Sequence, residues 1–70
     1  MGSAISIICN GQPSEAAAGE TLGQFLASRR LNPRYVAVER NGALVPREQH
    51  GEVVLAAEDR LEIVTLVGGG

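Results

Sequence analysis

The clearest candidates for chemistry are the last three residues of the sequence, which are all glycine: Gly68, Gly69 and Gly70. A chain end at Gly70 carries a carboxylate that is ionised at neutral pH. Because glycine has no Cβ atom, these residues give the carboxylate a thin stalk that fits a narrow channel. The residues from Val67 to Gly70 span at most about 14 Å when extended. From the residues alone the tail could be inert, an added end, or active. An active tail would carry its carboxylate into a partner's active site, where activation, for example as a mixed anhydride with AMP, exposes the carbonyl carbon to a nucleophile.

Other groupings of reactive residues are weak. Cys9 lies among isoleucines and far from His50 in the sequence, so we predict a small buried hydrophobic side chain rather than a Cys–His nucleophile. No Cys/His spacing supplies the four ligands of a zinc site, and no metal site is predicted. The adjacent acids Glu58 and Asp59 are interpreted as solvated turn residues. We expect the body of the protein to contain no catalytic residue.

Size and composition limit the possible classes of protein. Seventy residues support one domain, which we place at residues 1–66, with residues 67–70 as a flexible glycine tail. The net charge is −2 and the six basic residues, all Arg, form no stripe, which argues against nucleic-acid binding. No apolar run approaches the roughly 20 residues that cross a membrane. A single cysteine excludes an internal disulfide framework and favours a cytoplasmic location.

The elements that position the tail can be read from turns and periodicity. An Ile-rich strand over Ala4–Cys9 is followed by Asn10-Gly11, a dipeptide typical of type I′ hairpins, and by a second strand over Gln12–Ala17 whose Pro13 suits only a sheet edge. A capping box of Thr21 and Gln24 opens a helix. Leu22, Phe25 and Leu26 form one apolar face of this helix. We place Arg29 and Arg30 in its last turn, where cations suit the helix dipole, and Asn32-Pro33 ends it.

The second half of the sequence predicts another hairpin and a final strand. Tyr35–Arg40 alternates as a strand, Asn41-Gly42 is the turn, and Ala43–Val45 returns as an edge strand before Pro46. A turn or single helical turn (Arg47–Gly51), a short extended piece (Val53–Leu55) and a polar corner (Ala56–Asp59) follow. The last strand, Leu61–Val67, is nearly all apolar and so belongs in the centre of a sheet.

Pairing of the first and last strands, with the helix across one face, gives an α+β fold of the β-grasp type. It has a mixed sheet of four or five strands packed on one main helix. The predicted core combines inward-facing strand residues with the apolar face of the helix: Ile5, Ile7, Cys9, Leu22, Phe25, Leu26, Val36, Val38, Leu61 and Ile63.

The sequence resembles the bacterial sulfur-carrier proteins of thiamine biosynthesis, which are small ubiquitin-like β-grasp proteins. The matching segments are "AGET" at 18–21, "VERNG" at 38–42, "VPRE" at 45–48 and "DRLEIVTLVGGG" at 59–70. The resemblance implies that a ubiquitin-activating-type adenylyltransferase uses ATP to adenylate the carboxylate of Gly70. Sulfur from a cysteine desulfurase route then converts it to a thiocarboxylate, which serves thiazole synthase. The protein itself is expected to bind no cofactor.

Three alternatives remain open from the sequence. The tail could serve another sulfur pathway, such as molybdopterin or cysteine formation, or join the protein through Gly70 to target lysines as a modifier. It could also be the inert end of an interaction module. Where the tail is active, we predict that Leu66 and Val67 contribute to a partner docking patch at the end of the sheet, although Leu66 could equally close the core.

Overall fold

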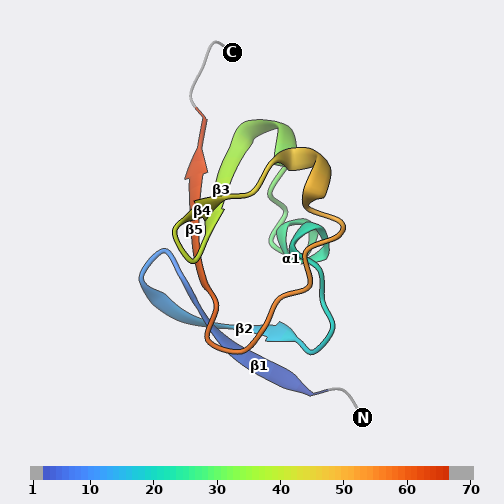
Figure 1. Cartoon of the computed structure of the whole chain (residues 1–70), viewed down its shortest axis with the longest axis vertical. Helices are drawn as coiled ribbons and strands as arrows, with labels where there is room; N and C mark the ends of the chain where they lie inside the picture. The colour runs from blue at the N-terminus through green and yellow to red at the C-terminus, as the bar shows by residue number, and fades with distance from the viewer. Residues whose placement is uncertain (1–2, 67–70) are drawn as a thin grey trace.

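Two hairpins and one central strand build the sheet. The computed structural model describes residues 3–66 of the chain. Within this range the sheet has five strands in the order β2-β1-β5-β3-β4, and one α-helix and two 3₁₀ turns complete the fold (Figure 1). The elements in chain order are β1 (Ala4–Cys9), β2 (Gln12–Ala17), α1 (Leu22–Ser28), η1 (Pro33–Tyr35), β3 (Val36–Arg40), β4 (Ala43–Leu44), η2 (Arg47–Gln49) and β5 (Arg60–Thr65).

Both predicted hairpins are confirmed by the backbone of their turns. Asn10 and Gly11 have φ angles of 52° and 78°, and Asn41 and Gly42 have φ angles of 54° and 87°. Positive φ at both central positions defines the type I′ turn, whose twist matches that of the strands it joins. The strands β2 and β4 lie at the two edges of the sheet, as the proline next to or within each of them predicts.

The first and last strands pair at the centre of the sheet, as predicted. The structure shows that they run parallel, through Ile8↔Arg60 and Cys9↔Leu61. On its other side β5 runs antiparallel to β3 from Arg40↔Leu61 to Val36↔Thr65. The predicted strand extends to Val67, which lies outside the described residues. Tyr35, predicted as the first residue of the third strand, instead ends η1.

The helix begins as predicted but ends early. The Thr21 hydroxyl accepts from the Gln24 N–H at 3.1 Å, and the Gln24 side chain accepts from the Thr21 N–H at 2.9 Å. Arg29 is the C-cap, and Arg30 has a φ of 60°. The predicted placement of both arginines in the last turn is therefore wrong. The Arg30 and Leu31 N–H groups donate to the carbonyls of Ala27 and Leu26 at 3.0 and 2.9 Å, which closes the helix with a Schellman motif.

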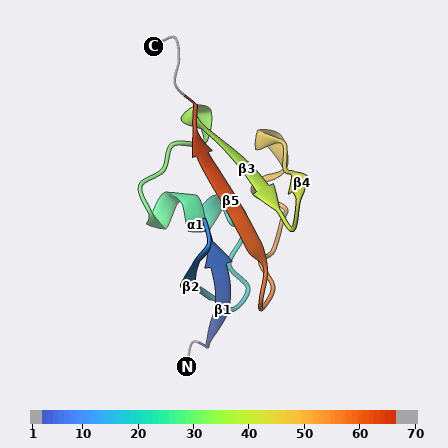
Figure 2. The ribbon, with the colours of Figure 1, turned by 90° about the vertical axis from the view of Figure 1, so that its left-hand side faces the viewer.

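The core lies between α1 and one face of the sheet, while the opposite face of the sheet has no helix against it in the described residues (Figure 2). The inward-facing set predicted from strand parity is confirmed. Seven of its members are buried: Ile7, Leu22, Phe25, Leu26, Val36, Val38 and Leu61. The other three, Ile5, Cys9 and Ile63, lie partly buried against them. Ala16 and Leu55, which were not predicted, are also buried in the core. None of the helices among the described residues is long and apolar enough to cross a membrane.

The polar corner before β5 contains the clearest error of the sequence analysis. The interpretation of Asp59 as solvated is wrong, because this residue is only 5% exposed. Its carboxylate accepts from Arg40 Nε at 2.8 Å, Asn41 Nδ2 at 3.0 Å and the Ala56 N–H at 2.8 Å. Burial alone would raise the pKa of this carboxyl, but these hydrogen bonds and the Arg40 charge hold the pKa below its usual value. Asp59 therefore fixes the start of β5, while its neighbour Glu58 is exposed as predicted.

Candidate functional site

The predicted working residues Val67, Gly68, Gly69 and Gly70 lie outside the described residues. The structure shows instead the strand that leads to them. β5 lies at the centre of the sheet, held by β1 and β3, and its last residues extend beyond β1 at the C-terminal end of the molecule (Figure 2). The Leu66 N–H donates to the carbonyl of Tyr35, the residue just before β3, at 2.7 Å. The backbone therefore stays hydrogen-bonded to this neighbouring segment up to Leu66. A rigid sheet thus sets the position from which the tail begins.

Leu66 does not close the core, because 52% of it is exposed. Val64 is 58% exposed and Tyr35 is 59% exposed. Val64 lies opposite Ala37 across the β5–β3 pair, and the hydrogen bond from Leu66 brings Tyr35 opposite Leu66. Side chains directly opposite each other share one face of a sheet. We call Tyr35, Ala37, Val64 and Leu66 the tail-side patch.

Sequence reasoning missed Val64 and Tyr35 as members of this patch. The signal was present, because placing Leu61 and Ile63 inward turns Val64 to the opposite face by the two-residue period of a strand. A group of apolar residues on a face without a covering helix is typical of an interaction surface. The tail-side patch therefore gives the predicted docking residue Leu66 a larger surface beside the tail.

Two carboxylates follow the patch along the same strands. Glu39 and Glu62 are directly opposite in the β3–β5 register, and both are exposed. Like charges in this arrangement destabilise a sheet. Within residues 3–66 no ion pair involves either carboxylate. The pair is thus available to a basic group of another molecule, next to the apolar surface.

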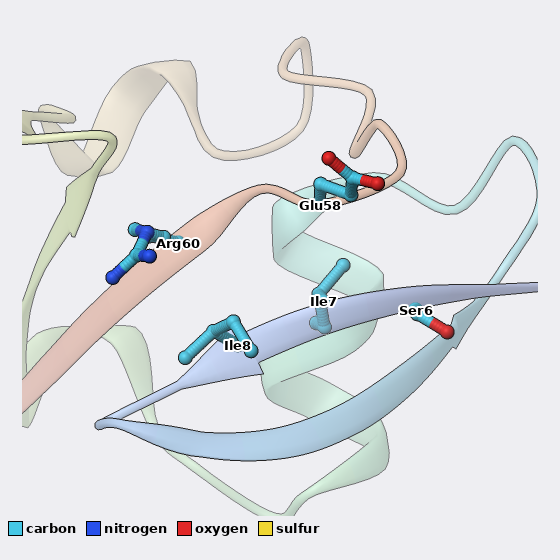
Figure 3. A pocket seen from close by; sticks show the side chains of 5 residues that line it. All are labelled: Ser6, Ile7, Ile8, Glu58 and Arg60. Atoms are coloured by element: carbon cyan, nitrogen blue, oxygen red, sulfur yellow. The ribbon is translucent and has the colours of Figure 1, made fainter.

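A hollow of mixed polar and apolar lining lies at the opposite end of β5 from the tail-side patch. It has a volume of about 290 Å³ and is lined by Ser6, Ile7, Ile8, Glu58 and Arg60 (Figure 3). Glu58, just before β5, and Arg60, the first residue of β5, stand along one side, while Ser6 and Ile8 come from β1 (Figure 3). Arg60 begins β5 and Leu66 follows its end, so the hollow is separated from Leu66 by the length of the strand.

The two other reactive side chains are Cys9 and His50. Cys9 packs partly buried against the core. Burial, the largest effect, raises the pKa of its thiol, which favours the neutral form. His50 is buried, and its Nε2 lies 3.2 Å from the Val45 carbonyl, with which it can form a hydrogen bond. The packing of Cys9 against the core agrees with its interpretation as a small apolar side chain, but Cys9 is only partly buried and not fully buried as predicted.

Comparison with known proteins identifies relatives over almost all of the chain. The ThiS family model matches residues 7–70. The sulfur carrier protein ThiS of Bacillus subtilis is 44% identical over 50 residues, which cover 71% of this chain and 76% of that protein. The crystal structure of the thiamine biosynthesis protein ThiS from Geobacter metallireducens superposes with a TM-score of 0.81 at 28% identity, covering 94% of this chain and 100% of that one. This match confirms the predicted β-grasp fold.

Two further relatives are much longer proteins. A thiazole synthase of Magnetococcus marinus is 46% identical over 66 residues, and a thiazole synthase of Paramagnetospirillum magneticum is 35% identical over 66 residues. Each match covers 94% of this chain, but this chain spans only 20% of the length of either thiazole synthase. A region similar to this chain is therefore part of a longer polypeptide in both relatives.

Proposed function

This chain belongs to the ThiS family, and we propose that it is a sulfur carrier of thiamine biosynthesis. The carboxylate of Gly70 attacks the α-phosphorus of ATP on a partner enzyme, and pyrophosphate leaves. A sulfur nucleophile, formed as a persulfide by a cysteine desulfurase route, then attacks the carbonyl carbon and AMP leaves. Thiol cleavage of the resulting acyl disulfide gives the thiocarboxylate, which donates its sulfur to thiazole synthase.

The observation that carries this proposal is the extent of the family match, which continues through the three glycines at 68–70. The relative from Bacillus subtilis is named as a sulfur carrier protein, and two other relatives are named as thiazole synthases. The anchored strand supports the same reading, because its hydrogen bond at Leu66 holds the backbone in the sheet up to the residue that precedes the tail. A carrier needs this rigid base for a thin tail.

The body of the protein serves as a handle in this scheme and catalyses nothing. We propose that a ubiquitin-activating-type adenylyltransferase and thiazole synthase both bind at the tail-side patch, with Val67 extending it. ATP is bound by the adenylyltransferase and not by the carrier. Because the same surface binds several partners one after another, each complex is expected to be transient. We also propose a cytoplasmic location, because the activation of the tail consumes ATP.

Intact-mass spectrometry tests the chemistry directly. The protein is incubated with ATP, the adenylating enzyme of its own organism and a sulfur source. We expect a mass increase equal to the replacement of one oxygen by sulfur, and we expect it to disappear without ATP or when Gly70 is deleted. Adding thiazole synthase with its other substrates should return the mass to its starting value. An unchanged mass, with an enzyme shown to be active on another carrier, would refute the proposal.

A further inference from the structure

The central strand β5 is paired unequally on its two sides. Its pairing with β3 continues from Leu61 to Thr65, whereas β1 pairs with it only at Arg60 and Leu61. The side of β5 that faces β1 is therefore covered at its start only. Figure 2 shows β5 continuing well beyond the arrowhead of β1 toward the C-terminal end.

The hydrogen bonds to β3 decide which backbone groups point to the uncovered side. The Asn41 N–H donates to the Arg60 carbonyl, and the Leu66 N–H donates to the Tyr35 carbonyl, both at 2.7 Å. In an antiparallel pair the residues that bond to the neighbour alternate along the strand. Even-numbered residues from Arg60 to Leu66 thus bond toward β3. The N–H and C=O groups of Ile63 and Thr65 point the other way.

The side chain of Asn10 forms hydrogen bonds with the first of these two residues, Ile63. Its carboxamide oxygen accepts from the Ile63 N–H at 2.7 Å, and its Nδ2 donates to the Ile63 carbonyl at 3.2 Å. The side chain thereby replaces one residue of a neighbouring strand, and the chain then turns away into β2 through Gly11. For Thr65, which is exposed, the structure shows no hydrogen-bond partner for either backbone group within residues 3–66.

We propose that an extended segment of a partner enzyme adds as a strand beside Thr65, in line with β1 and past the side chain of Asn10. Main-chain N–H and C=O groups of the incoming segment pair with those of Thr65, as in other cases of strand addition. The proposal rests on the proposed function, because β5 leads directly to the tail that the enzyme must receive. Pairing on the side of β5 that β3 does not occupy would hold the end of β5 extended where it leads to the partner's active site.

An enzyme fits this edge better than a second copy of the chain. The neighbouring face of β5 presents Glu62 beside Glu39, and the chain has a net charge of −2. Two copies meeting here would bring like charges together, which costs affinity. A segment with basic residues on the side of Glu62 and apolar residues near Val64 and Leu66 complements the edge in both charge and polarity.

Thr65→Pro is the variant that tests strand addition. Proline removes the N–H of residue 65, and this N–H makes no bond to β3, so the sheet of the free protein keeps its ladder. Thr65→Val is the matched control, because it retains the N–H and the β-branched shape. We expect Thr65→Pro to weaken binding to the adenylating enzyme or to thiazole synthase about tenfold, and Thr65→Val to bind like the wild type.

Amide hydrogen exchange of the wild-type protein gives a second readout that does not depend on the folding of a variant. The Thr65 amide should exchange rapidly in the free protein and become at least about tenfold slower in the complex, whereas the Leu66 amide is already protected when free. Normal binding of Thr65→Pro together with unchanged Thr65 exchange in the complex overturns strand addition and leaves the carrier function intact. A wild-type protein that gains no sulfur and binds neither enzyme overturns both.

Discussion

Glu39 and Glu62 lie directly opposite each other on the face of the sheet that no helix covers, with no ion pair to either carboxylate in residues 3–66. Their repulsion lowers the stability of the free protein. A basic group on a partner would relieve the repulsion, so the arrangement favours binding at the expense of folding. The pair also borders the tail-side patch, where Val64 is the next outward-facing residue of β5.

Glu62→Gln should affect folding and binding in opposite directions. Removing one charge is expected to raise the free energy of unfolding by about 0.2–1 kcal/mol. It should also weaken binding to the adenylating enzyme several-fold and reduce the dependence of the affinity on salt. Denaturant unfolding and titrations at two salt concentrations measure these effects. Glu48→Gln, at an exposed position in η2, is the matched control, and an equal response from both variants would contradict the assignment.

Val64→Asp should separate docking from chemistry. The new carboxylate lies on an exposed face and next to Glu62, so we expect the fold to persist and partner binding to fall at least about tenfold. The rate of sulfur incorporation should then drop at low enzyme concentration and recover when the enzyme is in excess. Val54→Asp places the same change at another exposed valine, outside the five-stranded sheet. If the two variants lose affinity equally, the tail-side patch is not the docking surface.

Asp59 should make stability depend on pH in the acid range. Its folded-state pKa lies below its usual value, which is about 3.9, so its contribution is complete above that pH and is lost as the pH falls through the folded-state value. Asp59→Asn should therefore lower the free energy of unfolding by about 1–3 kcal/mol at pH 7, and the difference from wild type should shrink below about pH 4. Urea unfolding across this range measures it.

Glu58→Gln is the control for this experiment, because it removes the adjacent exposed charge and leaves the bonds of Asp59 to Arg40, Asn41 and Ala56 in place. A difference between wild type and Asp59→Asn that stays constant from neutral to acid pH would show that the ionised carboxylate is not what stabilises the corner.

Local chemistry in the sequence was sufficient for most of the fold. Each Asn-Gly pair specified a hairpin because few other residues accept positive φ at two successive positions. The Thr21–Gln24 capping box set the start of the helix, and the alternation around Ile7 and Val38 identified the core face. These signals act over a few residues, which is why they can be read without the tertiary structure. The "VGGG" ending by itself indicates only a tail that could act on a partner, whereas the carrier function came from the resemblance to the sulfur-carrier family over "VERNG", "VPRE" and "DRLEIVTLVGGG".

Tertiary contacts decided the rest. The burial of Asp59 depends on Arg40 and Asn41, which are distant in sequence, and the early end of α1 depends on Arg30 adopting a left-handed conformation that its residue type disfavours. The opposition of Glu39 to Glu62 and the open backbone edge at Thr65 follow from the register of β5 between two strands. Register fixes which side chains share a face and which N–H groups remain unpaired, and it exists only when distant strands meet. The sequence by itself therefore determined the elements and the core, and the assembled sheet decided the surface around Leu66, while the role of Gly68, Gly69 and Gly70 stays a prediction.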